Sequence, residues 1–305
     1  MVLEALILWV ALAVDRAAGD PPNRLHPTAW LGQFIGWWGG SGRFAPGWER
    51  LYGTVCCLCS IFFFAVPFYL VSHLFPTFFY VVAGACLLSL TVGWRSLEEH
   101  VAAVERGLAA GGGRNEVQML VSRSTATLTD EEVRSAAYES MAENLTDAII
   151  GPLFWFTLAG LPGAAVFRAA NTMDAMLGYC DHRRYIGWFS ARLDDVLCYL
   201  PARFAGFCLI LWFLPFGRAG AAWRCMRRDA HLRPGYNGGI TMALVAGGTG
   251  TAFVKPGVYI IGDKEQSLSE GGPAIVSAVR GATVIAALIC TVAFIALGSL
   301  VPILL

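Results

Sequence analysis

The chain has 305 residues, of which 56% are hydrophobic and only 14% are charged. A soluble domain of this length would carry about 25% charged residues. The formal net charge is zero, so no basic excess is present to neutralise a nucleic-acid backbone, and no nucleic-acid partner is expected. Several apolar runs approach or reach the roughly 20 residues that cross a bilayer core. The composition therefore predicts an all-α, polytopic helical protein of the lipid bilayer.

The N-terminal third predicts three membrane segments and one loop. Residues 1–14 are apolar and lack the basic start of a signal peptide, so we expect a retained first membrane helix. Residues 15–50 predict a polar loop rich in Gly and Pro. His26 in this loop is either an ordinary histidine near the interface or a polar group presented to a substrate. Residues 51–74 and 76–94 predict a membrane hairpin with almost no charge.

The longest polar region follows this hairpin. Its portions 96–104 and 131–138 have the apolar spacing of amphipathic helices, and a triple glycine separates them. Thr129 or Asp130 is the expected N-cap of the second helix, because an acidic first turn follows.

The C-terminal third predicts further spans. Residues 193–216 are apolar with Arg203 inside them, residues 238–262 are moderately apolar and Gly-rich, and 282–305 predicts a final span. We therefore expect five to seven membrane segments. They belong to a single integral membrane domain, 1–305, with polar loops at 15–50, 94–147, 171–194 and 217–238.

Three acids precede a long apolar run. Glu139, Glu143 and Asp147 are spaced i, i+4 and i+8, so a helix places them on one face, with Asn144 beside them. A solvent-exposed helix face would readily account for one or two such acids. It accounts less well for three acids directly before a segment that enters the membrane. The functional alternative is a site for a divalent metal and phosphate, because hard oxygen ligands suit magnesium bridging to a nucleotide.

The apolar run 148–170 contains the break Gly160-Leu161-Pro162-Gly163 and is followed by Asn171 and Asp174, with Arg168 near its end. In a straight helix Asp147 and Asn171 would stand roughly 36 Å apart and could not share a site. Pro removes an amide donor and Gly permits a reversal. The sequence is therefore compatible with a broken or re-entrant helical hairpin at 148–178, which would return Asn171 and Asp174 to the acids, and equally with a kinked full span.

Asp194, Asp195 and Arg203 extend the same pattern of ionisable groups in apolar surroundings. Such residues are costly within a membrane and are functional candidates. Arg203 follows Asp195 by about two helical turns, so a structural Arg–Asp pair inside a bundle is the alternative.

These motifs resemble the adenosylcobinamide-phosphate synthase family, the integral membrane CbiB/CobD family of cobalamin biosynthesis. The resemblance covers most of the chain and is densest between residues 123 and 203. It is carried by Glu139-Ser140-Met141-Ala142-Glu143-Asn144 with Asp147, Pro152-Leu153-Phe154-Trp155, Arg168-Ala169-Ala170-Asn171-Thr172-Met173-Asp174, Asp194-Asp195-Val196 and Pro201-Ala202-Arg203, and by Gly19-Asp20-Pro21, His26-Pro27 and Arg95-Ser96-Leu97.

Two segments depart from the family pattern. Ser122-Arg123-Ser124-Thr125 stands where such proteins usually carry Gly-Arg-Asp-Thr, so Ser124 replaces an acid. The segment 233–239 stands where they usually carry Ser-Pro-Asn, a small residue and Gly, and Asn237 is the best match to the family's asparagine. These departures put the metal site, or catalysis itself, in question.

The resemblance implies an acid–amine ligase that uses ATP and Mg²⁺ to join adenosylcobyric acid to aminopropanol phosphate or a related amino alcohol. It implies that magnesium and nucleotide are held by Glu143, Asn144, Asp147 and Asp174. Phosphate or substrate carboxylate would face Arg168, Arg203 and Arg123, with His26, Asn171 and Asn237 as further binding candidates. Glu139, Asp194 or Asp195 would remove a proton from the amine.

Two other functions fit the same residues. A transporter also uses broken helices and intramembrane charges, although no inverted repeat is visible. A non-catalytic, corrinoid-binding membrane scaffold fits the two departures. Because ATP and corrinoid intermediates are cytoplasmic, we expect a multi-pass cell-membrane protein whose acidic face is cytoplasmic, with other membrane enzymes of late cobalamin assembly as partners.

Overall fold

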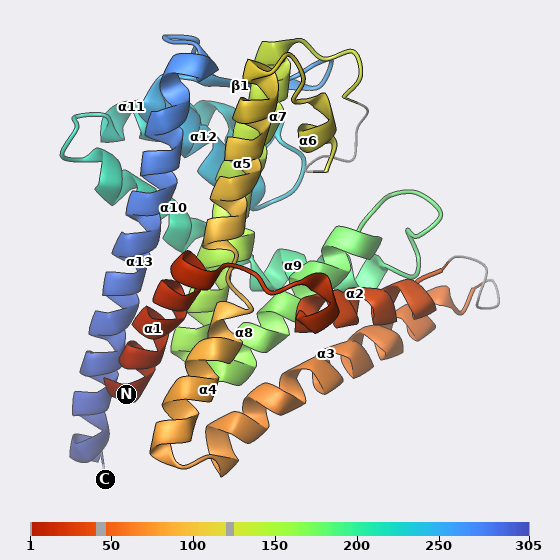
Figure 1. The fold of residues 1–305 in the computed structure, drawn as a ribbon, viewed down its shortest axis with the longest axis vertical. Helices are drawn as coiled ribbons and strands as arrows, with labels where there is room; N and C mark the ends of the chain where they lie inside the picture. Colours follow the sequence, from red (N-terminus) through yellow and green to blue (C-terminus); the bar gives the residue numbers. More distant parts are fainter. Residues whose placement is uncertain (1, 41–46, 120–124, 305) are drawn as a thin grey trace. The chain divides into compact units, whose positions relative to one another are not determined.

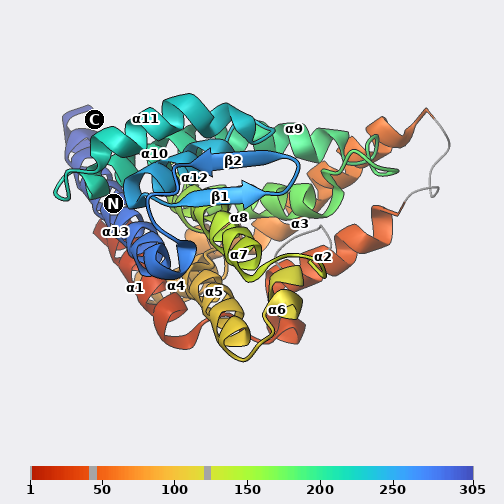
Figure 2. The same cartoon turned by 90° about the horizontal axis from the view of Figure 1, so that it is seen from above.

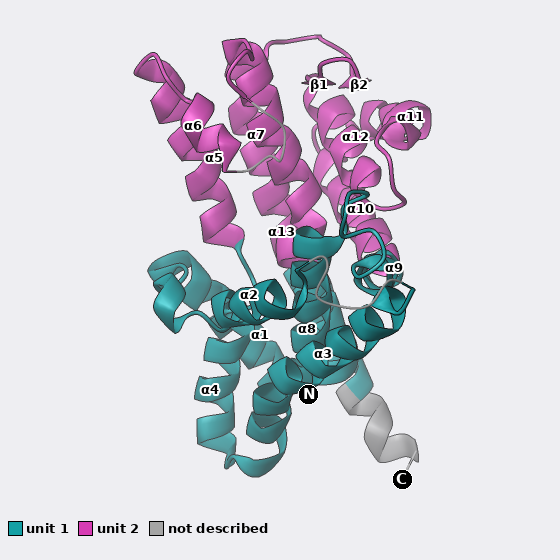
Figure 3. Cartoon of the chain, turned by 90° about the vertical axis from the view of Figure 1, so that its right-hand side faces the viewer, with its two compact units in different colours: residues 1–93, 151–198, 287–305 teal, residues 94–150, 199–286 magenta. Residues whose placement is uncertain are grey.

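The computed structural model describes residues 2–40, 47–119 and 125–304. The chain divides into two compact units, which Figure 3 shows in different colours. Unit 1 comprises Met1–Gly93, Gly151–Cys198 and Ala287–Leu305, and unit 2 comprises Trp94–Ile150 and Tyr199–Ala286.

Unit 1 is helical throughout its described part (Figure 1). Its elements are α1 (Val2–Ala18), η1 (Asn23–Leu25), α2 (Pro27–Trp38), α3 (Glu49–Leu74), α4 (Thr77–Ser89), α8 (Gly151–Leu177), α9 (Trp188–Leu197) and the C-terminal part of α13 (Leu268–Leu304). Helix α1 packs on α4, where Gly84 allows Ile7 and Leu161 to approach closely. Helix α3 packs along α8.

Helix α2 lies inside the range 15–50, where the sequence predicted a polar loop. That prediction was wrong for residues 27–38. Pro27 starts the helix because its fixed φ suits the first turn and it has no amide to leave unbonded. Leu31, Ile35 and Trp38 then form one apolar face, which is buried in a core with residues of α3 and α8. The Gly and Pro residues around this segment hid its helical periodicity.

Helix α8 is broken at the predicted position. Ala159 and Gly160 leave helical geometry, with φ −134° and +65°, and Gly160 tolerates the positive φ because it has no Cβ. A Cβ built on Gly163 would overlap the carbonyl oxygen of Trp155. In a straight helix these two residues, eight positions apart, would be separated by about 12 Å. The chain therefore folds back at the break.

Both arms of α8 also reach helix α9. Trp155, before the break, donates from Nε1 to the carbonyl of Leu197 at 3.0 Å. Asn171, after the break, donates from Nδ2 to Asp194 at 3.4 Å. Because Leu197 and Asp194 are neighbours on one short helix, the two arms lie close together there. The predicted break is therefore confirmed, and a straight helix is excluded. Whether the segment re-enters the membrane or spans it stays a prediction.

Unit 2 surrounds the buried helix α12 (Gly238–Thr249). Its other elements are α5 (Trp94–Ala109), α6 (Arg114–Gln118), α7 (Asp130–Asn144), the π-helical turn η2 (Leu145–Ile150), α10 (Tyr199–Phe213), α11 (Ala219–Asp229), η3 (Ala230–Leu232), β1 (Ala252–Lys255), β2 (Tyr259–Gly262) and the first part of α13. The predicted amphipathic helices correspond to α5 and α7, and the Thr129 cap is confirmed by a capping box with Glu132.

Strands β1 and β2 form an antiparallel hairpin that pairs Ala252 with Gly262 and Lys255 with Tyr259. Figure 2 shows the hairpin between α7 and α11. Ser135 of α7 fixes β1, since its Oγ accepts from the amide of Val254 at 2.6 Å. The sequence predicted one apolar segment at 238–262. Instead α12 ends where Gly250 adopts φ +71°, and the hairpin follows.

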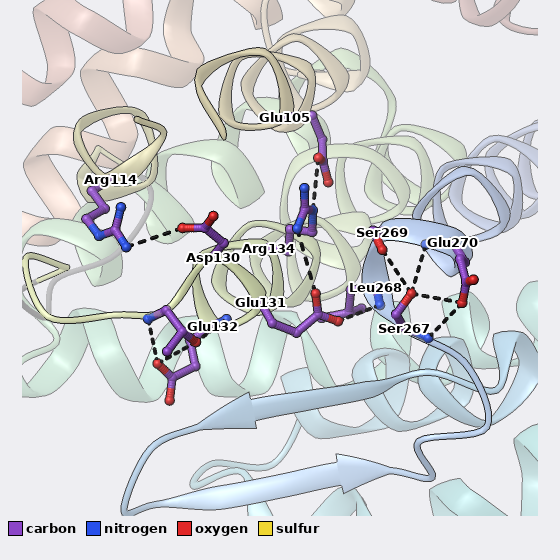
Figure 4. Close-up of polar contacts among 11 residues, drawn as sticks. Glu105, Arg114, Asp130, Glu131, Glu132, Arg134, Ser267, Leu268, Ser269 and Glu270 are labelled. Carbon is purple, nitrogen blue, oxygen red and sulfur yellow. Dashed lines mark hydrogen bonds and ion pairs between the residues drawn. The ribbon is translucent and has the colours of Figure 1, made fainter. Parts of the chain in front are cut away.

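The first turn of α7 is tied to its neighbours by polar contacts (Figure 4). Glu131 accepts the amide of Leu268 at 2.6 Å, which caps the start of α13. Arg134 donates to Glu105 of α5 at 3.1 Å. Helix α7 is thereby held against two other elements of its unit.

Within the described residues, five helical stretches are long and apolar enough to cross a membrane: 49–74, 77–109, 130–177, 188–213 and 268–297. This confirms the all-α, polytopic class, to which the structure adds one two-stranded sheet. Helix α1 is confirmed as a helix, but its 17 residues are fewer than the roughly 20 that span a bilayer core.

Asp229 provides a prediction on pH. Its carboxylate accepts from Arg228 at 2.7 Å and from the amide of Gly262 at 2.9 Å, and its side chain is only 7% exposed. The hydrogen bond from Arg228, opposed by burial and assisted by Gly262, lowers the pKa of Asp229. A lowered carboxyl pKa stabilises the fold above the ordinary value of about 4, and this stability is lost as pH falls through the folded-state pKa.

We therefore expect the thermal unfolding temperature in detergent to fall as the pH drops below the ordinary carboxyl value of about 4, and Asp229→Asn to flatten this slope. The matched control is Asp263→Asn, because Asp263 also contacts Arg228 but its side chain is 57% exposed. Identical acid slopes for wild type and Asp229→Asn would contradict the assignment.

Candidate functional site

Helix α7 and the turn that follows it present the three predicted acids of unit 2. Glu139 and Glu143 lie on α7, and Asp147 lies in the π-helical turn η2. A π-turn adds a residue to the helical repeat, so it shifts Asp147 from the α-helical spacing that the sequence suggested. Glu139 is buried, whereas Glu143 is partly exposed.

Glu143 forms an ion pair with Arg233, which follows η3. The side chains are 24% and 30% exposed, so the pair remains accessible to solvent. Asp147 also acts on the Arg233 guanidinium. Although burial opposes the charge, Glu143 and Asp147 raise the pKa of Arg233. A Cβ at Gly238 would lie 3.0 Å from both Arg233 Nε and Glu143 Oε1, so glycine permits this close packing.

Glu139 accepts a hydrogen bond of 2.6 Å from the hydroxyl of Tyr259 on β2. Burial and the nearby carboxylates of Glu139 and Glu143 raise the pKa of Tyr259, and Arg233 opposes this only in part. Tyr259 therefore stays protonated near neutral pH and holds the Glu139 carboxylate in place as a donor.

Arg203 of α10 joins the same region of unit 2. It donates from Nη1 to Asn237 at 2.7 Å and from Nη2 to the carbonyl of Tyr236 at 3.3 Å. Its guanidinium also lies 3.6 Å above the ring of Tyr199. Because Asn237 directly precedes Gly238, Arg203 anchors the loop that carries Arg233. We call Glu139, Glu143, Asp147, Arg203, Arg233, Asn237 and Tyr259 the acid–arginine cluster.

A second group lies in unit 1. Arg168, Asn171 and Asp174 occupy the returning arm of α8, and Asp194 lies on α9. Asp194 accepts from Asn171, and the thiol of Cys198 lies 3.6 Å from its oxygens. The structure thus brings Asn171 and Asp194 together. That this group meets the acids of α7 stays a prediction, because the two groups belong to different units.

Other predicted site residues have local partners. His26 caps α2 by accepting the amide of Thr28 at 3.1 Å, and its ring lies 3.5 Å from Asp20. Asn144 donates to the carbonyl of Ser140 at 2.9 Å. Asp195 pairs with Arg192 at 3.3 Å. Arg123 and Ser124 lie outside the described residues.

Sequence reasoning missed Arg233 and Tyr259 as members of the cluster. Arg233 was noted in a departure from a family pattern, but no role in the site was assigned to it. Tyr259 was hidden in an apolar segment, although the Pro256-Gly257 pair between two alternating runs is a hairpin signal that could have placed it on a strand.

Glu143 and Asp147 are of the chemical kind that binds magnesium, but the described part of the chain forms no complete protein cage for it. Carboxylates are the ligands that magnesium prefers, and one or two of them suffice when substrate phosphates complete the coordination. Within the described residues, no three His, Cys, Asp or Glu side chains are grouped to hold a metal. Glu143 and Asp147 are the acids of unit 2 that could contribute.

The fold and these residues define a polytopic helical membrane protein with a partly open cluster of acids and arginines. The chain belongs to the family described as CobD/Cbib protein, whose profile matches residues 8–299. This confirms the family resemblance that the sequence motifs indicated.

Similar proteins cover almost the same length. The chain is 38% identical over 270 residues to the probable cobalamin biosynthesis protein CobD of Methanothermobacter thermautotrophicus, covering 85% of this chain and 87% of the relative. It is 37% identical over 295 residues to that of Archaeoglobus fulgidus, covering 96% of each. The cobalamin biosynthesis protein CobD of Chromobacterium violaceum is 37% identical over 260 residues, covering 82% of this chain and 81% of the relative. No solved structure matches significantly.

Proposed function

We propose that this protein is a membrane enzyme of cobalamin biosynthesis that forms an amide bond between adenosylcobyric acid and aminopropanol phosphate, or a related amino alcohol, at the expense of ATP. The observation that carries the proposal is the acid–arginine cluster, in which carboxylates and guanidinium groups meet beside a partly exposed loop. The names of the relatives support a biosynthetic role. The chemistry below explains why such a reaction needs both kinds of charge.

A carboxylate must become electrophilic before an amine can attack it. In the proposed first step, the terminal phosphoryl group of ATP passes to a propionate oxygen, which gives an acyl phosphate and ADP. The amine nitrogen then attacks the carbonyl carbon, the C–N bond forms, and the C–O bond to phosphate breaks. One proton leaves the ammonium before attack, and another leaves the nitrogen afterwards, so the products are the amide, ADP, inorganic phosphate and one net proton.

The arginines supply the positive charge that phosphoryl transfer requires. Arg233 is held charged by Glu143 and Asp147, and Arg203 is fixed by Asn237 and the Tyr199 ring. Planar guanidinium groups bind phosphate and carboxylate through two donors. We assign Arg203 and Arg233 to phosphate or to the substrate carboxylate. Arg168 and Arg123 retain the same proposed role.

Glu139 is the proposed base in unit 2. Its carboxylate is buried and receives the Tyr259 hydroxyl, so its orientation is fixed. Asp194 and Asp195 are the alternative bases in unit 1, and Asp194 is the better positioned because Asn171 orients it.

A magnesium ion held by Glu143 and Asp147 would neutralise charge on the nucleotide phosphates, and Asp174 retains its proposed role as a metal ligand. Asn144 is assigned to the nucleotide, and His26, Asn171 and Asn237 to substrate binding. We place the acid–arginine cluster on the cytoplasmic face, where ATP and corrinoid substrates are available, with other late enzymes of cobalamin assembly as membrane partners.

The test is ligation by detergent-purified protein supplied with adenosylcobyric acid, aminopropanol phosphate, ATP and magnesium, with mass spectrometry of the corrinoid. A mass gain of one amide bond should appear only with ATP. Asp147→Asn should lower the rate at least about 100-fold, because it removes one of the fixed charges that we propose stabilise phosphoryl transfer. Asp130→Asn, on the exposed first turn of the same helix, is the control. A folded, corrinoid-binding protein that forms no product would refute the ligase proposal.

A further inference from the structure

A cavity of about 480 Å³ lies in unit 2, on residues that the proposed reaction does not use. One wall is aromatic and the other is polar, and helix α13 closes the side. The residues that line it are Trp212, Phe213, Phe216, Arg218, Gly248, Thr249, Glu265, Gln266, Ala274 and Ser277. This volume, and an apolar wall with a few polar groups, are typical of sites for small molecules.

Glycines create the space for its aromatic wall. A Cβ on Gly281 of α13 would overlap the ring of Trp212, and a Cβ on Gly248 of α12 would overlap the ring of Phe213. The aromatic end of α10 is therefore packed against two other helices of the unit.

The cavity adjoins two candidate membrane spans. Trp212 is near the end of the span 188–213, and its neighbour Gly281 belongs to the span 268–297. Arg280 is paired with Glu98 at 2.6 Å, whereas Val284, one turn further along α13, is an exposed apolar residue. The polarity of α13 thus changes beside Trp212. Tryptophan and arginine at such a boundary are typical of the interface between lipid and water.

The polar wall contains an ion pair with separate positive and negative ends. Arg218 donates from Nη2 to Glu265 at 2.8 Å, and from Nε to the carbonyl of Gly248 at 3.0 Å. These bonds fix the guanidinium at the end of α12 and leave Nη1 for another acceptor. Glu265 is about half exposed, with a side-chain exposure of 54%. One ligand with a phosphate and an ammonium group would satisfy both side chains.

We propose that this cavity binds an aminoalkyl phosphate zwitterion, with phosphate on Arg218 and ammonium on Glu265. The aromatic wall, and the change from charged to exposed apolar side chains along α13, favour the headgroup of phosphatidylethanolamine as the source, with acyl chains that would continue along Trp212 and Phe216. A free amino-alcohol phosphate shares the headgroup chemistry but has no chains for this wall. The site is separate from the acid–arginine cluster, so it does not depend on the proposed reaction.

The test is retention of lipid by the purified full-length protein, measured by native mass spectrometry after exchange into mixed micelles with equal phosphatidylethanolamine and phosphatidylglycerol. Wild type should retain phosphatidylethanolamine about tenfold over phosphatidylglycerol, the ratio that a difference of 1.4 kcal/mol in binding produces. Ser277→Phe should abolish retention by filling the cavity. Val284→Phe, at an exposed position two turns along α13 that does not line the cavity, is the matched control and should retain the lipid.

Glu265→Gln tests the charge assignment with little change in shape. It should reduce the preference for phosphatidylethanolamine to about unity while the melting temperature stays near that of wild type. Calorimetry with free phosphoethanolamine and aminopropanol phosphate distinguishes the two sources of the headgroup. If wild type binds a free zwitterion tightly, Glu265→Gln removes that binding, and no lipid is retained, then the site binds a soluble zwitterion and the lipid assignment is wrong. Equal retention of both lipids by wild type, unchanged in Ser277→Phe, would overturn the proposal.

Discussion

Replacing Glu143 by glutamine is expected to reduce the rate of amide-bond formation by about 10²–10³-fold, the loss found when one preorganised electrostatic group is removed from an active site. The change keeps the size of the side chain but removes the anion that orients Arg233. It also leaves a guanidinium that is only 30% exposed without its main partner. We expect the unfolding free energy to fall by about 1–3 kcal/mol, because the Arg233 guanidinium would stay largely removed from water without the carboxylate that compensates for its lost hydration.

Two further variants separate these effects. Glu99→Gln removes an equally charged side chain from a surface pair that is 60% exposed on the glutamate side, and it should change neither property. The double variant Glu143→Gln with Arg233→Gln should recover stability but not activity, because no unpaired charge remains while the phosphate-binding group is lost. The assignment would be wrong if Glu143→Gln kept wild-type activity, or if the double variant regained it.

The acids of the acid–arginine cluster were predicted from local spacing, whereas Asn237 and the binding role of Arg203 were predicted from the family resemblance. Glu139, Glu143 and Asp147 follow one another by four residues, and a single helical segment with its π-turn carries them. Arg233 and Tyr259 reach them from 90 and 120 residues away. Local periodicity cannot predict such contacts, because they arise from the packing of η3, α12 and the β-hairpin around α7.

Backbone breaks were predictable where Gly and Pro control the dihedral angles. The break at Gly160 was anticipated for this reason, whereas the end of α12 at Gly250 was not, since its apolar surroundings suggested one continuous segment. In both places a glycine adopts positive φ, +65° and +71°. The sequence shows that a glycine is present, but the need for that conformation depends on what the following segment packs against.

The α8 hairpin gives the second large effect, on stability. Gly163→Ala is expected to lower the unfolding free energy by about 2–3 kcal/mol, because the new methyl group meets the Trp155 carbonyl and the Ala159 side chain of the opposite arm. Thermal unfolding in detergent would measure the loss. Gly36→Ala is the matched control, because a Cβ there has nothing within 4 Å and the higher helix propensity of alanine should stabilise α2 by up to about 1 kcal/mol.

The two glycines also distinguish close packing from backbone strain. Gly160→Ala introduces no overlap, since the nearest atom is Pro162 Cδ at 3.7 Å. Its φ +65° and ψ −161° lie in a region that only glycine readily adopts, so alanine should cost about 1–3 kcal/mol through backbone strain. Gly163→Ala has ordinary helical geometry and should lose stability through contact alone. If Gly163→Ala melted with wild type, the two arms of α8 would not be packed as described. The returning arm with Asn171 would then lose its fixed position relative to Asp194.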